Sequence, residues 1–120
     1  MLLQDKKGNY YLVVTTSSKS LDLLAVAKSM SSGRLSFASA ENLLELLGVR
    51  AGSLSPLALV NDEGRRVRLV VDLDLADEQA FLFHPLESNA SVSLSRAALD
   101  DFMTNIDRQA DWLNLPERAA

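Results

Sequence analysis

The 120-residue chain contains no cysteine, one histidine and few aromatic side chains. The absence of cysteine excludes disulfides, thiolate zinc sites and a cysteine nucleophile. With one histidine the chain also lacks the usual ligands of transition metals, so we expect neither metal catalysis nor another bound cofactor. Magnesium held by carboxylates alone stays open, because 16 acidic residues are present.

The chain also lacks an apolar run long enough to cross a bilayer, and its first residues lack the basic and then apolar order of a signal peptide. We therefore expect a cytoplasmic protein with no membrane partner. Apolar residues make up 48% of the sequence, which suffices for one compact core, while the length leaves no room for a second domain. The sequence thus predicts a single domain over residues 1–120.

Positive charge is scarce, since 12 basic residues face 16 acidic ones and the net charge is -4. Proteins that bind long duplexes without sequence preference carry a basic excess, so a generic DNA-binding role is disfavoured. A local cluster can still neutralise the few phosphates at one end of an RNA. The one dense basic cluster comprises Arg65, Arg66 and Arg68, and its simplest interpretation is a solvated strand end beside a turn.

The first half of the chain predicts a hairpin, two helices and a short strand. Ser20 is the expected N-cap of the first helix, whereas Ser39 and Gly48 are the expected caps of the second. The expected elements are strands at residues 2–4, 10–15 and 34–38, a helix from Leu21 to about Ser31, and a helix at residues 40–47.

The second half predicts four strands and a last helix. Ser95 is the expected N-cap of that helix, and Trp112, Leu113 and Leu115 are expected to fold back onto the core. The expected elements are strands at residues 57–60, 67–72, 79–83 and 91–94 and a helix that runs to about Ile106. Because strands outnumber helices and most connections are too short for crossover helices, we expect an α+β domain with a mixed, largely antiparallel sheet.

The segment Gly52-Ser53-Leu54-Ser55-Pro56 predicts a rigid turn ahead of an apolar strand. Glycine permits otherwise costly backbone angles and proline fixes the exit, so backbone N–H groups can face a ligand. Such donors would stabilise the oxyanion of ester hydrolysis. The pattern alone leaves two alternatives, a catalytic loop of these five residues, with the two serines as hydrogen-bonding residues and not nucleophiles, or a turn without chemistry.

His84 follows an apolar strand and precedes a proline, so on its own it is most simply a half-buried residue at a strand end. No neighbouring serine, cysteine or carboxylate pattern indicates a triad. A cluster of carboxylates at the end of a predicted strand is interpreted as a solvated segment, because it lacks the convergent geometry of acid/base pairs. The cluster consists of Asp72, Asp74, Asp77 and Glu78.

Together with Phe83-His84-Pro85-Leu86, the glycine-to-proline loop resembles the YbaK and prolyl-tRNA synthetase insertion-domain family, whose members hydrolyse mischarged aminoacyl-tRNA. The likeness runs from Leu2 to about Phe102 and is nearest to the freestanding Ala-tRNA(Pro) deacylases. It implies a curved mixed sheet with flanking helices and, as partner, a tRNA acceptor end that carries an aminoacyl ester. It also implies that residues 52–56 line the ester pocket and that His84 helps to select the amino acid.

The resemblance breaks at two places. Family members carry a helix and a Thr-Lys-Asn run before the first strand, so the family lysine would fall just before Met1, and Lys6 and Lys7 lie in the hairpin turn instead. After the histidine, Ser88 and Asn89 stand where the family has asparagine and threonine. We expect either an N-terminally truncated domain or a short relative that binds without efficient hydrolysis. In both cases residues 1–120 should hydrolyse Ala-tRNA(Pro) poorly or not at all, and the surface exposed by the short start should favour self-association.

Two functions follow from these observations. The first is an editing deacylase, in which water attacks the ester of a mischarged tRNA, most simply Ala-tRNA(Pro). The second is a catalytically silent binding or interaction module on the same fold. Hydrolysis of Ala-tRNA(Pro) distinguishes the two.

Overall fold

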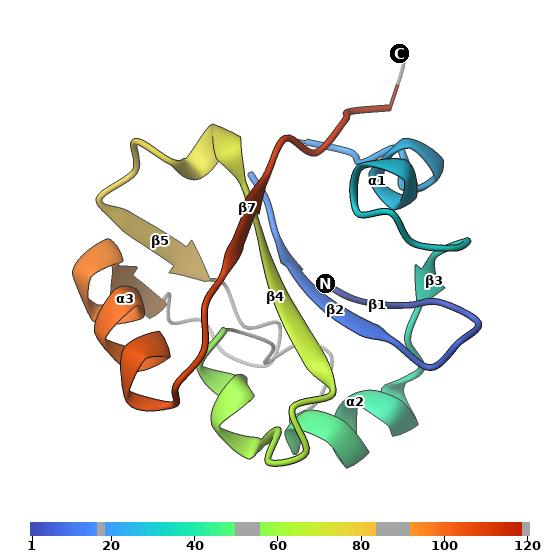
Figure 1. Cartoon of the computed structure of the whole chain (residues 1–120). Helices are drawn as coiled ribbons and strands as arrows, with labels where there is room; N and C mark the ends of the chain where they lie inside the picture. Colours follow the sequence, from blue (N-terminus) through green and yellow to red (C-terminus); the bar gives the residue numbers. More distant parts are fainter. Residues whose placement is uncertain (17–18, 50–55, 84–91, 119–120) are drawn as a thin grey trace.

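The computed structural model describes residues 1–16, 19–49, 56–83 and 92–118. These residues form a five-stranded mixed sheet, a separate two-stranded sheet and three α-helices (Figure 1). Among the described helices, none has the length and apolar character needed to cross a membrane.

The five-stranded sheet has the strand order β3-β1-β2-β4-β7. Its strands are β1 (Leu2–Gln4), β2 (Tyr10–Val14), β3 (Ser36–Phe37), β4 (Val67–Asp72) and β7 (Asp111–Leu113). β1 pairs antiparallel with β2 and β3, whereas β4 pairs parallel with β2 and β7. β4 therefore lies inside the sheet, which explains why all its residues except Arg68 are buried.

The predicted N-terminal hairpin is confirmed, with Leu2 opposite Leu12 and Gln4 opposite Tyr10. Its turn is held by Asp5, whose carboxylate accepts from the backbone N–H groups of Lys7 and Asn9, each at 2.9 Å. A short acidic side chain that bonds the backbone just ahead is a common turn former.

The second sheet consists of β5 (Ala80–Phe83) and β6 (Val92–Ser95), which pair antiparallel. Three of the five strand pairings among the described residues are thus antiparallel. The expected α+β class, with a mixed and mostly antiparallel arrangement and flanking helices, is confirmed.

Side-chain caps set the starts of the three helices, which are α1 (Leu23–Ser29), α2 (Ala40–Leu47) and α3 (Arg96–Asn105). Ser39 and Ser95 accept from backbone N–H groups in the first turns of α2 and α3, as predicted. The prediction of Ser20 as the cap of α1 is wrong, because Asp22 accepts from Leu24 and Ala25 instead. Serine and aspartate are both common N-cap residues, so the sequence alone does not distinguish Ser20 from Asp22 as the cap.

The predicted strand at residues 57–60 is wrong, because Pro56–Asn61 form a 3-10 helix, η2. Pro56, Ala58 and Leu59 are buried while Leu57 and Val60 are exposed, so one side of a tight helix faces the core. Proline favours the first turn of a helix, where its missing N–H costs nothing. A run of four apolar residues does not by its periodicity distinguish a buried strand from a buried helical turn.

Two apolar clusters cover the two faces of the five-stranded sheet. Alternation along β4 places Val67, Leu69 and Val71 in the first cluster and Val70 in the second. The first cluster also takes residues from α2, η2, β5 and α3, and the second takes residues from α1 and from the C-terminal segment. Leu115 is fully buried in the second cluster and Trp112 packs on the first, so the predicted return of the C-terminus to the core is confirmed.

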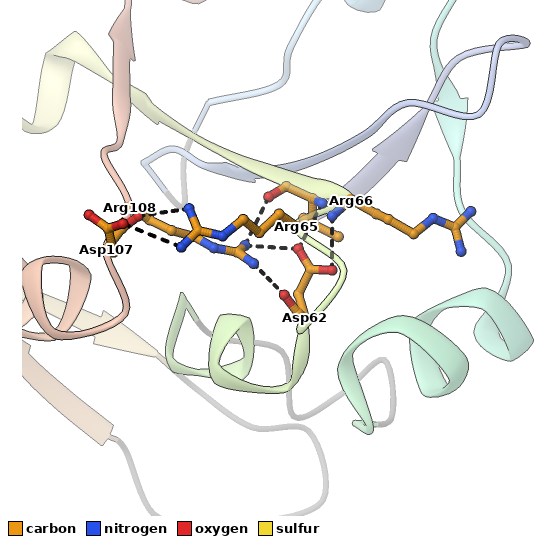
Figure 2. A network of polar contacts seen from close by, with 6 residues as sticks. Asp62, Arg65, Arg66, Asp107 and Arg108 are labelled. Atoms are coloured by element: carbon orange, nitrogen blue, oxygen red, sulfur yellow. Dashed lines mark hydrogen bonds and ion pairs between the residues drawn. The ribbon is translucent and has the colours of Figure 1, made fainter.

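A buried ion pair joins the turn before β4 to the segment after α3 (Figure 2). Asp62 accepts from the backbone N–H groups of Arg66 and Val67 at 3.0 and 2.8 Å, and from Arg108 Nη1 at 2.8 Å. Arg108 also donates to the backbone carbonyls of Asp62 and Val67. Burial raises the pKa of the Asp62 carboxyl, but these hydrogen bonds outweigh it and the pKa lies below its usual value.

Removal of Asp62 leaves a mostly buried guanidinium and two backbone N–H groups without their acceptor. We expect Asp62→Ala to lower the free energy of unfolding by about 3 kcal/mol, the usual cost of breaking a buried pair from one side. Chemical denaturation measures the loss, and the exposed Asp77→Ala serves as the control, with a change below about 0.5 kcal/mol. Additive effects of Asp62→Ala and Arg108→Ala in the double variant would contradict the pairing.

Candidate functional site

Gly52, Ser53, Leu54, Ser55 and His84 lie outside the described residues. The structure describes the last residue of the predicted loop, Pro56, which is buried as the first residue of η2. It also describes the elements on both sides of each predicted segment. These elements show what holds the two segments in place.

The loop at residues 49–55 leaves α2 and enters η2, and a side chain ties the two together. α2 ends at Gly48, whose left-handed backbone (φ 67°) is the usual helix C-cap conformation. Asn61, at the end of η2, donates from Nδ2 to the carbonyl of Leu47 at 2.8 Å. A Cβ at Gly48 would lie 3.4 Å from that Nδ2, so the positive φ and not a lack of space is what favours glycine here. The end of η2 is thereby tied to the end of α2.

The segment at residues 84–91 connects β5 to β6, which are paired up to Phe83 and Val92. Phe81 on β5 belongs to the same apolar cluster as Ala58 and Leu59 on η2. Both predicted site segments therefore extend from elements that pack in one core. A backbone-lined pocket needs such a base, because preorganised donors stabilise charge without reorganisation during the reaction.

The interpretation of Asp72 as part of a solvated segment is wrong, because its side chain is fully buried. Lys19 Nζ lies 2.8 Å from Asp72 Oδ2 and 3.0 Å from Asp74 Oδ2, and Thr15 donates to Asp72 at 2.6 Å. Asp72 also caps the short 3-10 helix η3 (Leu73–Leu75). Asp74, Asp77 and Glu78 are exposed as predicted. The sequence signal was weak, because Lys19 is 53 residues away in a polar connection.

The ion pair between Lys19 and Asp72 keeps both side chains charged. Burial lowers the pKa of Lys19, but the hydrogen bonds and charges of Asp72 and Asp74 outweigh it, so the pKa is raised. Burial raises the pKa of Asp72, yet the bonds from Lys19 and Thr15 outweigh it and the pKa is lowered. Lys19 also lines an open hollow of about 630 Å³ together with residues of the α1 start and Arg118. A lysine held charged by two carboxylates is unsuited to act as a general base, so we assign it a structural role.

The arginine cluster is exposed as predicted, yet each of its guanidinium groups has partners. Arg65 donates to the carbonyl of Asp107 at 3.0 Å, and Arg68 lies 2.5 Å from Asp111. Arg66 lies over the ring of Tyr10, 5.2 Å from its centroid. No group of three or more acidic or histidine side chains that could hold a metal ion occurs among the described residues. The carboxylate-only magnesium site thus finds no support in that part of the chain.

The fold and the sequence agree with known editing proteins. A family model described as "Aminoacyl-tRNA editing domain" matches residues 1–102. The prolyl-tRNA editing protein ProX of Acetoanaerobium sticklandii is 35% identical over 101 residues, which are 83% of this chain and 62% of that protein. The prolyl-tRNA synthetase associated domain-containing protein 1 of Bos taurus is 36% identical over 110 residues, covering 87% of this chain and 61% of that protein.

A solved structure of a proposed trans-editing enzyme for prolyl-tRNA synthetase matches 98% of this chain and 68% of its own, with a TM-score of 0.70 and 20% identity. At that identity the match concerns the fold alone. The protein belongs to the aminoacyl-tRNA editing domain family. The chain spans about three fifths of the length of the curated relatives that it matches.

Replacement of Asp72 tests the buried pair at the end of β4. We expect Asp72→Asn to cost about 1–3 kcal/mol, because Lys19 loses its buried partner, whereas Asp74→Asn on the exposed side costs less than about 1 kcal/mol. Thermal and chemical unfolding across pH measure both effects.

The pH dependence has two limits. Because folding lowers the pKa of Asp72, its contribution to the stability of the fold is complete above about pH 3.8, the ordinary pKa of the group. The contribution is lost as the pH falls through the lowered pKa of the folded state. Because folding raises the pKa of Lys19, its contribution to the stability of the fold is complete below about pH 10.5, the ordinary pKa of the group. The contribution is lost as the pH rises through the raised pKa of the folded state. The gap between the wild-type protein and Asp72→Asn should therefore be widest between these limits; a gap independent of pH would contradict the ion pair.

Proposed function

We propose that the protein hydrolyses the ester of a mischarged aminoacyl-tRNA, with Ala-tRNA(Pro) as the substrate. Membership of the editing-domain family supports this proposal, as do relatives named for prolyl-tRNA editing. The structural observation that supports it is the hydrogen bond between Asn61 and Leu47, which ties η2 to the end of α2, the two elements on either side of residues 49–55. The sequence of that loop suits an ester pocket lined by backbone N–H groups.

In the proposed reaction, the carbonyl of the aminoacyl ester lies against the backbone of residues 52–56. A water oxygen attacks the carbonyl carbon, and loop N–H groups stabilise the oxyanion of the tetrahedral intermediate. The bond from carbon to the ribose oxygen then breaks, and the proton of the water passes to that oxygen, relayed by the neighbouring ribose hydroxyl. The products are the free amino acid and the tRNA. No protein nucleophile takes part.

His84 is proposed as the residue that selects the amino acid. It directly follows β5, the strand whose Phe81 packs with η2 in the first core cluster. A side chain in the pocket wall discriminates by size and by polar groups left unpaired, and one methylene is worth about 1–3 kcal/mol in such a site.

Release of alanine from Ala-tRNA(Pro) tests the function, with Pro-tRNA(Pro) as the control. Since the resemblance implies a lysine ahead of the first strand, the assay compares residues 1–120 with the same sequence preceded by the family's helix and Thr-Lys-Asn segment. We expect residues 1–120 to release alanine slowly or not at all and the extended chain to release it well above the buffer rate, with Pro-tRNA(Pro) spared. Release at the buffer rate from both chains would favour the silent binding module. Self-association stays a prediction, to be measured by sedimentation.

Gly52→Val should abolish binding of a non-hydrolysable alanyl-adenosine analogue, because a branched side chain keeps the loop backbone away from the ester. Gly33→Val is the matched control, since a Cβ there meets no atom within 4 Å. Calorimetry measures the affinity of each variant for the analogue, and thermal unfolding checks that both variants are as stable as the wild-type protein. Equal affinities for the two variants would remove the loop from the site.

His84→Ala should change the order in which alanyl, seryl and cysteinyl esters are hydrolysed, by about tenfold or more for the most affected pair. Gln79→Ala, an exposed change just before β5, should leave the order as it is. Competition between the three substrates gives the ranking directly. If His84→Ala alters stability but not the ranking, the histidine is a structural strand-end residue.

A further inference from the structure

We propose that the surface formed by Arg65, Arg66, Arg68 and Tyr10, hereafter the arginine surface, binds the phosphate backbone of the tRNA. The inference rests on the proposed function and adds a contact away from the ester. Four of the 12 basic residues of this acidic chain, these three arginines and Arg108, gather at the start of β4 and the segment after α3. Asp62, Asp107 and Asp111 lie beside them, so the surface combines four guanidinium groups with three partner carboxylates.

Strand register places two of these arginines beside tyrosines that belong to the two faces of the sheet. In the parallel pairing of β2 with β4, Tyr10 stands opposite Val67 and Tyr11 opposite Arg68. The guanidinium groups of Arg66 and Arg68 consequently lie 5.2 and 5.9 Å from the ring centroids of Tyr10 and Tyr11. Arginine on an aromatic face is held in one orientation at little cost in hydration, because guanidinium is weakly hydrated.

A hollow of about 390 Å³ lies between the first half of β4 and the segment at residues 107–111. β7 pairs with β4 only from Val70 onwards, so the earlier part of β4 separates from this segment. Arg65, Arg68 and Arg108 line the hollow together with Asp107 and Asp111. Figure 2 shows Arg65 reaching from the turn before β4 toward Asp107, while Arg108 turns inward to Asp62.

The carboxylates in this hollow orient the arginines without occupying all their donors. The side chain of Asp107 is 95% exposed and lies 3.5 Å from Arg65, a geometry that contributes little energy in water. Arg65 and Arg68 are each 59% exposed, and a guanidinium has five N–H donors in a fixed fork. Their outward N–H groups can therefore meet phosphate oxygens, for which the fork geometry is suited. Arg108 is not expected to bind phosphate, because its guanidinium group is mostly buried and forms an ion pair with Asp62.

An RNA backbone fits these features better than an acidic protein. Its phosphates repeat at regular spacing, which suits arginines that spread in different directions from one turn (Figure 2). Tyr10 adds a partly buried aromatic ring beside the guanidinium of Arg66, and aromatic rings next to arginines are typical of surfaces that bind RNA.

The test is the binding of unacylated tRNA(Pro), followed by fluorescence anisotropy over a range of salt concentrations. We expect the double variant Arg65→Gln/Arg68→Gln to bind at least about tenfold more weakly and to lower the salt slope by about two, one for each phosphate contact. Arg34→Gln removes the same kind of charge from an exposed position beside β3, at the other edge of the sheet, and should change neither quantity comparably. Arg65→Lys/Arg68→Lys should keep most of the salt slope.

A second ligand separates this inference from the proposed function. The alanyl-adenosine analogue lacks the acceptor-stem phosphates, so the double glutamine variant should bind it as the wild-type protein does. If that variant binds tRNA like Arg34→Gln, or loses affinity without a change of salt slope, the arginine surface is not a phosphate contact. If the wild-type protein fails to bind the analogue, the proposed ester site fails, whatever the arginines do.

Discussion

The carboxylate of Asp62 is the contact on which the arrangement of the domain depends. It accepts hydrogen bonds from the backbone of Arg66 and of Val67, the first residue of β4, and from Arg108, which follows α3. The turn before β4 is thereby fixed to the C-terminal part of the chain. Its neighbour Asn61 bonds in the opposite direction to the end of α2. Two consecutive side chains thus join η2, β4, α2 and the segment after α3.

The far end of β4 is held by a second buried ion pair, between Asp72 and Lys19. The two ion pairs are built alike, because each carboxylate accepts a hydrogen bond from the backbone as well as from a cationic side chain. Buried charges are tolerated only when they are paired and hydrogen-bonded. The central strand is thus anchored at both ends by charge, while its middle is anchored by apolar packing on both faces. The parallel register with β2 places Tyr11 opposite Arg68.

The local parts of this structure could be predicted from the sequence. Ser39, Gly48 and Ser95 act as helix caps as expected, and the hairpin and β4 follow from polar turns and apolar runs. The errors occur where distant contacts decide. Residues 57–60 form a helical turn because α2 and the core bury one side of it, and a four-residue apolar run carries no period that shows this. The prediction that Asp72 is solvated is wrong because its partner, Lys19, is distant in sequence.

For the site, the sequence provided the segments and the structure provides their supports. The described elements explain how a loop between α2 and η2, and a connection between β5 and β6, can extend from one packed core. We propose that these two segments together form the ester pocket. The test is to map amide chemical shifts during titration with a non-hydrolysable alanyl-adenosine analogue. We expect the largest shifts at the amides that flank both segments, those of Val49, Leu57, Phe83 and Val92. Shifts concentrated instead around Lys19 and Leu21, at the hollow beside α1, would contradict it.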